Sequence, residues 1–301
     1  MTEEQRRALI AVLLFIASGV LFVVMNAMVK AMTATVDTMV ITWGRYFFHV
    51  AFVIVLFPRA ALGVFRSGQV AVQIGRSVLL LGSTVTNFLA LSLMSLADVS
   101  AIIFTAPILV AFLAVLFLKE RVVAWRWVLI GLGFSGALII VQPGGGGFGL
   151  GAVLALACAC CYAFYQITTR IVREAEPIVS LLYGGLVGVV GLSLVAPFYW
   201  QPLTPIDWAM LVIIGSLGAA GHLLVILALQ RAEASKMAPF TYLQLVWAML
   251  ASLFVFGDAP GTATLIGAAV IVTSGLLLYR LDLQEAAARA TVRPETTTSG
   301  G

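Results

Sequence analysis

The sequence predicts an all-α, polytopic membrane protein with ten transmembrane helices in two inverted five-helix repeats. Apolar residues make up 62% of the 301 residues and charged residues only 10%, which is too few charges to cover the surface of a soluble globule. The apolar residues form ten continuous runs of about 18 to 25 residues, each long enough to cross a hydrocarbon core about 30 Å thick as a helix. The second half of the chain also echoes the first.

The ten runs set the expected spans. We place them at residues 8–30, 38–57, 70–95, 97–118, 124–141, 149–172, 178–199, 207–230, 236–256 and 262–280. Transmembrane strands would need short segments of alternating polarity, which these runs lack, so we expect helices. The first run follows Arg6 and Arg7 like a signal peptide, but it is too long for one, and we interpret it as an uncleaved span.

The basic residues indicate the orientation, because Lys and Arg are retained on the cytoplasmic side of a membrane. With both termini in the cytoplasm, the other side of the membrane has Lys30 alone, and Arg45 falls inside the second span. The net charge of +4 is then a signal of topology and of attraction to anionic lipids, not of nucleic-acid binding. The basic residues expected in cytoplasmic segments are Arg6, Arg7, Arg59, Arg66, Arg76, Lys119, Arg121, Arg126, Arg170, Arg173, Arg231, Lys236, Arg280, Arg289 and Arg293.

An uncharged, glycine-rich joint, Gln142 to Gly149, divides the spans evenly. We expect a first repeat over 1–143, a second over 144–281, and a cytoplasmic tail over 282–301 whose first part could extend the last helix and whose remainder is disordered. At a constant offset, Leu14, Ala17, Asn26 and Lys30 correspond to Leu154, Ala157, Gln166 and Arg170. Five spans per repeat make the second repeat enter the membrane from the opposite side, so the repeats are inverted, as in many secondary transporters.

The clearest recurrence is between residues 89–120 and 227–258. Both stretches open with Leu-Ala-Leu, break at small residues and end at an acid, Glu120 or Asp258. Within each, about five residues, 96–100 or 232–236, join two spans, which predicts tight antiparallel hairpins. Small residues in the spans suggest close helix packing: Gly131, Gly133, Gly136, Gly267, Gly275, Cys158, Cys160 and Cys161.

These features together resemble the drug/metabolite transporter superfamily. The residues that carry the resemblance are Arg45 early in the second span, Pro107 in the middle of the fourth, and the acids that close the fourth and ninth spans. Over residues 8–280 the chain is most similar to the ten-helix exporters with paired EamA-type domains, and among these to the aromatic amino-acid exporters of bacterial inner membranes. Leu245 stands where the second repeat would match Pro107, so the two repeats need not hinge alike.

The resemblance implies a central cavity lined by the third, fourth, eighth and ninth helices, with contributions from the first, second, sixth and seventh. It also implies alternating access by rocking of the two halves, and a location in the bacterial cytoplasmic membrane. We expect a monomer with a small-molecule substrate in a lipid bilayer, and no cofactor, metal or nucleic-acid partner.

Polar residues in the hairpins are candidates for substrate binding. Ser83, Thr84 and Asn87 lie within about one turn of the third span, with Ser83 and Asn87 on one face, and His222 lies at matching depth in the eighth. Hydrogen bonding between helices is the alternative role for such side chains.

Aromatic side chains are the second group of candidates, because they can stack on a substrate ring while a polar group binds its amino or carboxyl end. Tryptophans at span ends, Trp125, Trp127, Trp200 and Trp208, are better explained as membrane-interface anchors. The aromatic candidates and their polar neighbours are Phe104, Thr105, Tyr242, Gln244, Trp247, Trp43 and Tyr183.

A third group of residues could serve gating or coupling: Pro107, Arg45, His49, Asn26 and Gln166. Pro107 should kink its helix and free the carbonyl of Ile103. Arg45 and His49 share a helix face, and a charge inside a span is a functional candidate by default. The alternative for Arg45 is that it snorkels to the nearby outer surface.

All thirteen acids lie at span ends, in loops or in tails, and none lies in a membrane interior. No acid occurs between Glu4 and Asp37, where the small multidrug exporters of the superfamily carry a first-helix Glu. Proton-coupled pumps usually use an embedded carboxylate. We therefore expect facilitated transport of a zwitterionic or neutral solute, with His222 or His49 as the carriers of any coupled proton.

The sequence thus favours an exporter of aromatic or other bulky amino acids, and not an enzyme. A sugar-phosphate or nucleotide-sugar antiporter would need several embedded Lys or Arg residues, and only Arg45 qualifies. An intramembrane enzyme would need a carboxylate pair, a histidine metal motif or a nucleophile elbow, and none is present.

Overall fold

A computed structural model describes residues 3–61, 70–118, 124–142, 149–171, 177–229, 231 and 234–291. All regular structure in these ranges is helical, and seven of its helices are long and apolar enough to cross a membrane. Shorter apolar helices at Leu96–Val110, Trp127–Val141 and Phe240–Phe256 occupy the remaining three predicted positions. The elements are α1 (Glu3–Met32), α2 (Thr38–Leu56), α3 (Pro58–Ala61), α4 (Val70–Leu93), α5 (Leu96–Ile103), α6 (Ala106–Leu118), α7 (Ala124–Val141), α8 (Leu150–Ile171), α9 (Pro177–Val195), η2 (Ala196–Tyr199), α10 (Pro205–Leu229), α11 (Ala234–Phe256) and α12 (Thr262–Thr291).

The fourth span is broken. α5 ends at Ile103, Phe104 and Thr105 form a turn, and α6 restarts with Pro107 in its first turn. Proline lacks an N–H and its ring clashes with the carbonyl four residues earlier, so the helix cannot continue straight through this point. The predicted kink is confirmed. The matching helix α11 runs without a break through Leu245, so the two repeats differ here.

The first hairpin turns earlier than predicted. α4 ends at Leu93, and Ser95 caps α5: its Oγ accepts the Asp98 N–H at 3.1 Å and donates to the Asp98 carboxylate at 2.8 Å. Such reciprocal capping fixes a helix start. The turn therefore lies at Met94 and Ser95, and the expected joint at 96–100 is wrong because these residues form the first turns of α5. In the second hairpin α11 starts at Ala234, so part of the expected joint at 232–236 is helical, and residues 230, 232 and 233 lie outside the described residues.

Two other boundaries concern the ends of the repeats. α12 continues to Thr291, so the first part of the predicted tail extends the last helix and is not disordered. Residues 292–301 lie outside the described residues, as do 143–148 of the glycine-rich joint and Lys119 and Glu120 after the fourth span.

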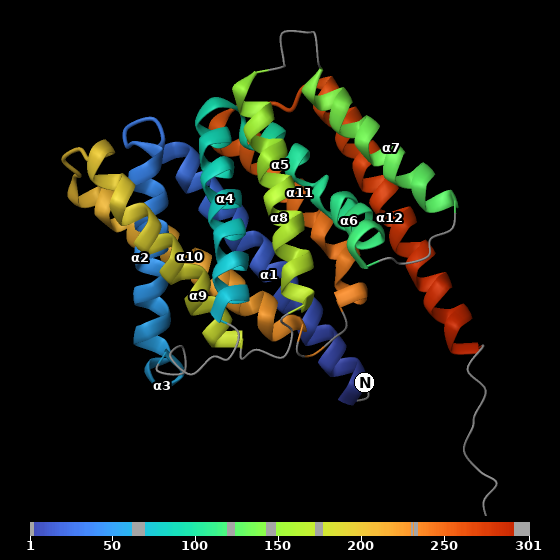
Figure 1. The fold of residues 1–301 in the computed structure, drawn as a ribbon. Coiled ribbons are helices and arrows are strands. Elements are labelled where there is room, and N and C mark those ends of the chain that lie inside the picture. Colours follow the sequence, from blue (N-terminus) through green and yellow to red (C-terminus); the bar gives the residue numbers. More distant parts are fainter. Residues whose placement is uncertain are drawn as a thin grey trace, which may run out of the picture.

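The helices of the two halves pair as a pseudo-two-fold axis requires. The first helix of each half packs on the third of the other, α1 on α10 and α8 on α4. The second helices α2 and α9 pack on each other, as do the fourth, α5 and α11, and the fifth, α7 and α12. In Figure 1 the N-terminus and α3 lie at one end of the bundle and the α1–α2 connection at the other. The halves therefore interlock along their whole length, in opposite orientations.

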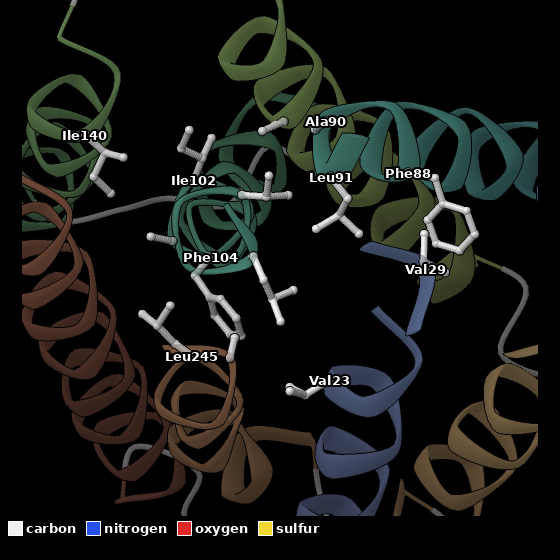
Figure 2. Packing of buried hydrophobic residues seen from close by; sticks show 14 of the residues in the cluster. Val23, Val29, Phe88, Ala90, Leu91, Ile102, Phe104, Ile140 and Leu245 are labelled. Atoms are coloured by element: carbon white, nitrogen blue, oxygen red, sulfur yellow. The ribbon is translucent and has the colours of Figure 1, made fainter. Parts of the chain in front are cut away.

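Apolar side chains fill the contact between the halves and cover the outside. The largest buried cluster draws residues from α1, α4, α5, α11 and α12. Figure 2 shows Phe104, in the turn after α5, directed toward α11, beside Leu245 and across from Val23 of α1. Large apolar side chains such as Val55, Leu194 and Phe254 are exposed, which a lipid environment explains.

Glycines allow α7 and α12 to touch through their backbones. A Cβ on Gly136 would lie 2.8 Å from the carbonyl oxygen of Gly267, and a Cβ on Gly267 would lie 2.5 Å from that of Gly136. Ser274 of α12 donates to the carbonyl of Leu129 on α7 at 2.5 Å. The predicted close approach is confirmed at this crossing, whereas Gly131 faces open space.

Candidate functional site

Arg45 lies inside the bundle. Its side chain is 3% exposed, its guanidinium carbon lies 4.4 Å from the ring centroid of Tyr46, and Nη2 approaches Nε2 of His222 at 3.5 Å. Gly218 of α10 makes room for it, because a Cβ there would lie 3.4 Å from Arg45 Nε. The alternative that Arg45 snorkels to the surface is wrong, since its head group turns toward the second half of the protein.

His49 joins the same group. It is 2% exposed, and its ring centroid lies 6.2 Å from that of His222. The edge of Phe22 from α1 packs on His222, with 5.0 Å between the ring centroids. Arg45 and His49 thus do share a face of α2, and this face meets α10 of the other repeat. We name Arg45, His49 and His222 the basic cluster.

Some polar atoms of the basic cluster lack a partner within the described part of the chain. They are Nε and Nη1 of Arg45, two donors of its guanidinium group. Placing a guanidinium in a membrane interior is costly unless its charge is compensated. The cluster is therefore a place where the protein presents unused hydrogen-bond donors at the contact between its halves.

The polar residues of the third span bond to three different helices. The Ser83 hydroxyl lies 3.3 Å from Sγ of Cys158 on α8, and Thr84 accepts a hydrogen bond from the Tyr46 hydroxyl at 2.9 Å. Nδ2 of Asn87 donates to Oδ1 of Asn26 on α1 at 3.2 Å. Each of these bonds joins two helices. The sequence suggested that His222 shares a polar band with the third span, but His222 lies next to Arg45 of α2.

The burial of a second arginine was not predicted from the sequence. Arg76 was expected at the cytoplasmic surface, but it is 6% exposed, donates from Nη2 to the carbonyl of Ser180 on α9 at 2.8 Å, and lies over the Tyr165 ring at 5.3 Å. Its neighbour Gln73 is fully buried and donates to Oγ of Ser180 at 2.9 Å. The spacing of Gln73, Arg76 and Ser77 could have indicated this burial, because the three residues share one helix face inside an apolar run.

The aromatic candidates in the turn after α5 and on α11 form a ring pair. The centroids of Phe104 and Tyr242 are 6.1 Å apart, with 41° between the ring planes, and both side chains are buried. The Tyr242 hydroxyl packs against Gly275 of α12, so its polar end points away from Phe104. The Thr105 hydroxyl donates to its own helix, at the carbonyl of Ile102.

The remaining candidates lie on α8, α9 and α11. Gln244 is partly buried next to Gly19 of α1, and Trp247 is 39% exposed on α11. Gln166 is partly buried on α8, and Tyr183 is buried on α9 in a separate apolar cluster.

Trp43 belongs to an aromatic group at the end of the bundle where α2 begins. Its Nε1 donates to Oγ of Ser193 at 3.0 Å, and its ring lies 5.4 Å from that of Trp200, which in turn lies 6.1 Å from Trp208. Such a collection of tryptophans matches a membrane-interface anchor.

Comparison with known proteins now identifies the family. The model of the EamA-like transporter family matches the chain twice, over residues 9–142 and 149–280. The chain belongs to the EamA-like transporter family. The drug/metabolite transporter resemblance is therefore correct, and this EamA-like protein is a multi-pass membrane transporter.

Three curated relatives show the range of the family. A S-adenosylmethionine uptake transporter of Rickettsia bellii is 26% identical over 84% of this chain and 87% of the relative. A riboflavin transporter of Rhizobium johnstonii is 27% identical over 93% and 94%. The pseudopaline exporter CntI of Pseudomonas aeruginosa is 26% identical over 89% and 95%.

One solved crystal structure superposes on this EamA-like transporter with a TM-score of 0.65. It covers 90% of this chain and 98% of the other at 19% identity. At this identity the likeness shows the shared fold.

Proposed function

We propose that this EamA-like transporter carries a bulky metabolite with a planar ring across the bacterial inner membrane, and that aromatic amino acids are its first candidate cargo. One observation carries the proposal. The basic cluster joins α2 of one repeat to α10 of the other; its Arg45 and His49 are buried, and Arg45 holds unpaired donors. Polar groups at the midplane between inverted repeats are where secondary transporters bind their substrates.

A ring-binding role is supported by the pair of Phe104 and Tyr242, which also joins the two repeats. An aromatic face can stack on a planar ring at low entropic cost. The relatives named for S-adenosylmethionine and riboflavin carry compounds that contain planar heteroaromatic rings, so we take a ring, more than an amino-acid backbone, as the common feature of the cargo.

Alternating access is supported by the symmetric helix pairing. The contact of α1 with α10 has its equivalent in the contact of α8 with α4. Rocking of the halves can therefore open one of these contacts toward one side of the membrane, and the reverse motion can open its equivalent toward the other side. The asymmetry of basic residues supports an orientation with the N-terminus in the cytoplasm.

We propose facilitated transport, without proton coupling. Among the described acids, Asp37, Asp98, Asp207 and Asp258 lie at or beyond helix ends, and Asp282 and Glu285 lie in the part of α12 that follows the predicted tenth span. A proton on His222 would place a second positive charge next to Arg45. Such a carrier runs down the gradient of its cargo, so it exports whenever the cytoplasm holds the higher concentration.

The test is counterflow of labelled tryptophan into liposomes that contain the purified protein and unlabelled tryptophan. Competition by phenylalanine, tyrosine, S-adenosylmethionine and riboflavin but not by leucine is the expected result. Equal competition by leucine would contradict the preference for a ring. An imposed pH gradient should leave the initial rate unchanged, and a strong dependence at zero substrate gradient would contradict facilitated transport.

A further inference from the structure

The described spans bury two arginines, Arg45 and Arg76, on adjacent helices α2 and α4. Both keep unpaired N–H groups, at Nε and Nη1 of Arg45 and at Nε of Arg76. Arg45 lies over the ring of Tyr46, and the Tyr46 hydroxyl donates to Oγ1 of Thr84 at 2.9 Å and to the carbonyl of Leu80 at 3.3 Å, both on α4. Leu80 stands four residues, one helical turn, after Arg76 on α4.

His222 lies next to Arg45 and His49. Nε2 of His222 lies 3.5 Å from Nη2 of Arg45, and the ring centroids of His222 and His49 are 6.2 Å apart. Arg45, His49 and His222 from α2 and α10 therefore meet at the contact between the halves, and Arg76 is a second buried cation on the adjacent helix α4.

Acids that could neutralise this charge are engaged elsewhere among the described residues. Asp37 caps α2 through the Met39 N–H at 2.7 Å, Asp98 accepts from Thr264 at 2.5 Å, and Asp207 accepts from Thr204 at 2.7 Å. Two buried guanidinium groups without a carboxylate are unfavourable in the empty protein. An anionic ligand would remove that penalty.

We infer that Arg45, Arg76, His49 and His222 form an oxyanion subsite, which binds an acidic group of the transported metabolite, either a carboxylate or a phosphate. The inference rests on the proposed function and specifies the charge of its cargo. Guanidinium groups bind both oxyanions through paired N–H donors, and neutral imidazoles add further donors. The finding that Arg76 is buried also removes the sequence argument that only one embedded cation was available for phosphate.

The test compares pairs of compounds that differ only in the acidic group. Tryptophan with tryptophanamide probes a carboxylate, and riboflavin 5′-phosphate with riboflavin probes a phosphate. Each is offered as a competitor in counterflow with the wild type, Arg45→Gln and Arg76→Gln. Arg59→Gln is the matched control, because Arg59 is exposed on α3 and loses the same charge.

The wild type and Arg59→Gln should favour the acidic member of one pair, and Arg45→Gln should reduce that preference about 10- to 100-fold, as expected for a lost charge-assisted bond. Preference in the first pair assigns a carboxylate and preference in the second a phosphate. No preference in either pair, or a preference that survives in both Arg→Gln variants, would overturn the subsite. Loss of ring selectivity with the acid preference intact would contradict the proposed function alone.

Thermal unfolding without substrate separates this role from a structural one. Removing an uncompensated buried charge should leave Arg45→Gln at least as stable as the wild type. A lower melting temperature of the empty Arg45→Gln variant would identify Arg45 as a structural residue and overturn the proposal. Arg45→Lys, which keeps the charge and loses the planar donor geometry, should retain part of the acid preference.

Discussion

Replacing Gly136 by Ala tests the backbone contact between α7 and α12. The added Cβ would lie 2.8 Å from the carbonyl oxygen of Gly267 and 2.9 Å from Cγ1 of Ile271. Carbon–oxygen contacts normally begin at about 3.3 Å, so the overlap with a backbone atom is about 0.5 Å. A side chain could rotate away from such an overlap, but a carbonyl cannot, and the two helices must separate.

The magnitude follows from two opposing effects. Overpacking a tight contact costs about 1 to 3 kcal/mol, whereas Ala is favoured over Gly in a helix by up to about 1 kcal/mol. We expect a net loss of about 1 to 2 kcal/mol for Gly136→Ala. Gly131 lies on the same helix with nothing within 4 Å of its added Cβ, so Gly131→Ala should be neutral or slightly stabilising.

The measurement is thermal unfolding of the purified variants in detergent, followed by fluorescence-detected size-exclusion chromatography. Gly136→Ala should melt below the wild type and Gly131→Ala at or above it. Equal melting temperatures for the two variants would refute the reasoning, because they share every effect except the contact with α12.

Three further variants test other features. Gly275→Ala should displace the Tyr242 ring, which packs on that glycine, and weaken competition by ring compounds in counterflow; unchanged competition would show that the position of Tyr242 is irrelevant to ring binding. Ser95→Ala should lower the free energy of unfolding by about 0.5 to 2 kcal/mol through loss of the α5 cap, measured as the melting temperature, and no change would contradict the capping role. Pro107→Ala should slow transport more than it changes the melting temperature, because it restores an N–H that favours a continuous helix; a full transport rate would show that the break is not needed.

The span positions could be predicted because a single physical quantity, the length of each apolar run, decides them. The run at 124–141 became α7 with the same limits, and 38–57 differs from α2 by one residue. The hairpin turn was harder to place. The turn lies at Met94 and Ser95 and not at 96–100, because the side chain of Ser95 caps α5.

The candidate site could be predicted only in part. The pairing of Arg45 with His49 on one helix face follows from their spacing, but whether Arg45 points outward or inward depends on what α10 offers, and Gly218 leaves the space. The burial of Arg76 was not predicted, because Arg76 lies close to the start of α4 and such a position suggests the membrane surface. Ser180 and Tyr165, on helices far away in the sequence, make it a buried residue.

The interrupted fourth helix and its uninterrupted counterpart α11 bear on the energetics of the cycle. In a perfectly symmetric pair of inverted repeats, exchanging the conformations of the halves would convert the inward-open protein into an outward-open protein of equal energy. The turn at Phe104 and Thr105 exists in one half alone, so the two states of the proposed cycle are not mirror images. The empty transporter therefore has a preferred resting side, and a substitution that made the two helices alike would bring the populations of the two states closer together.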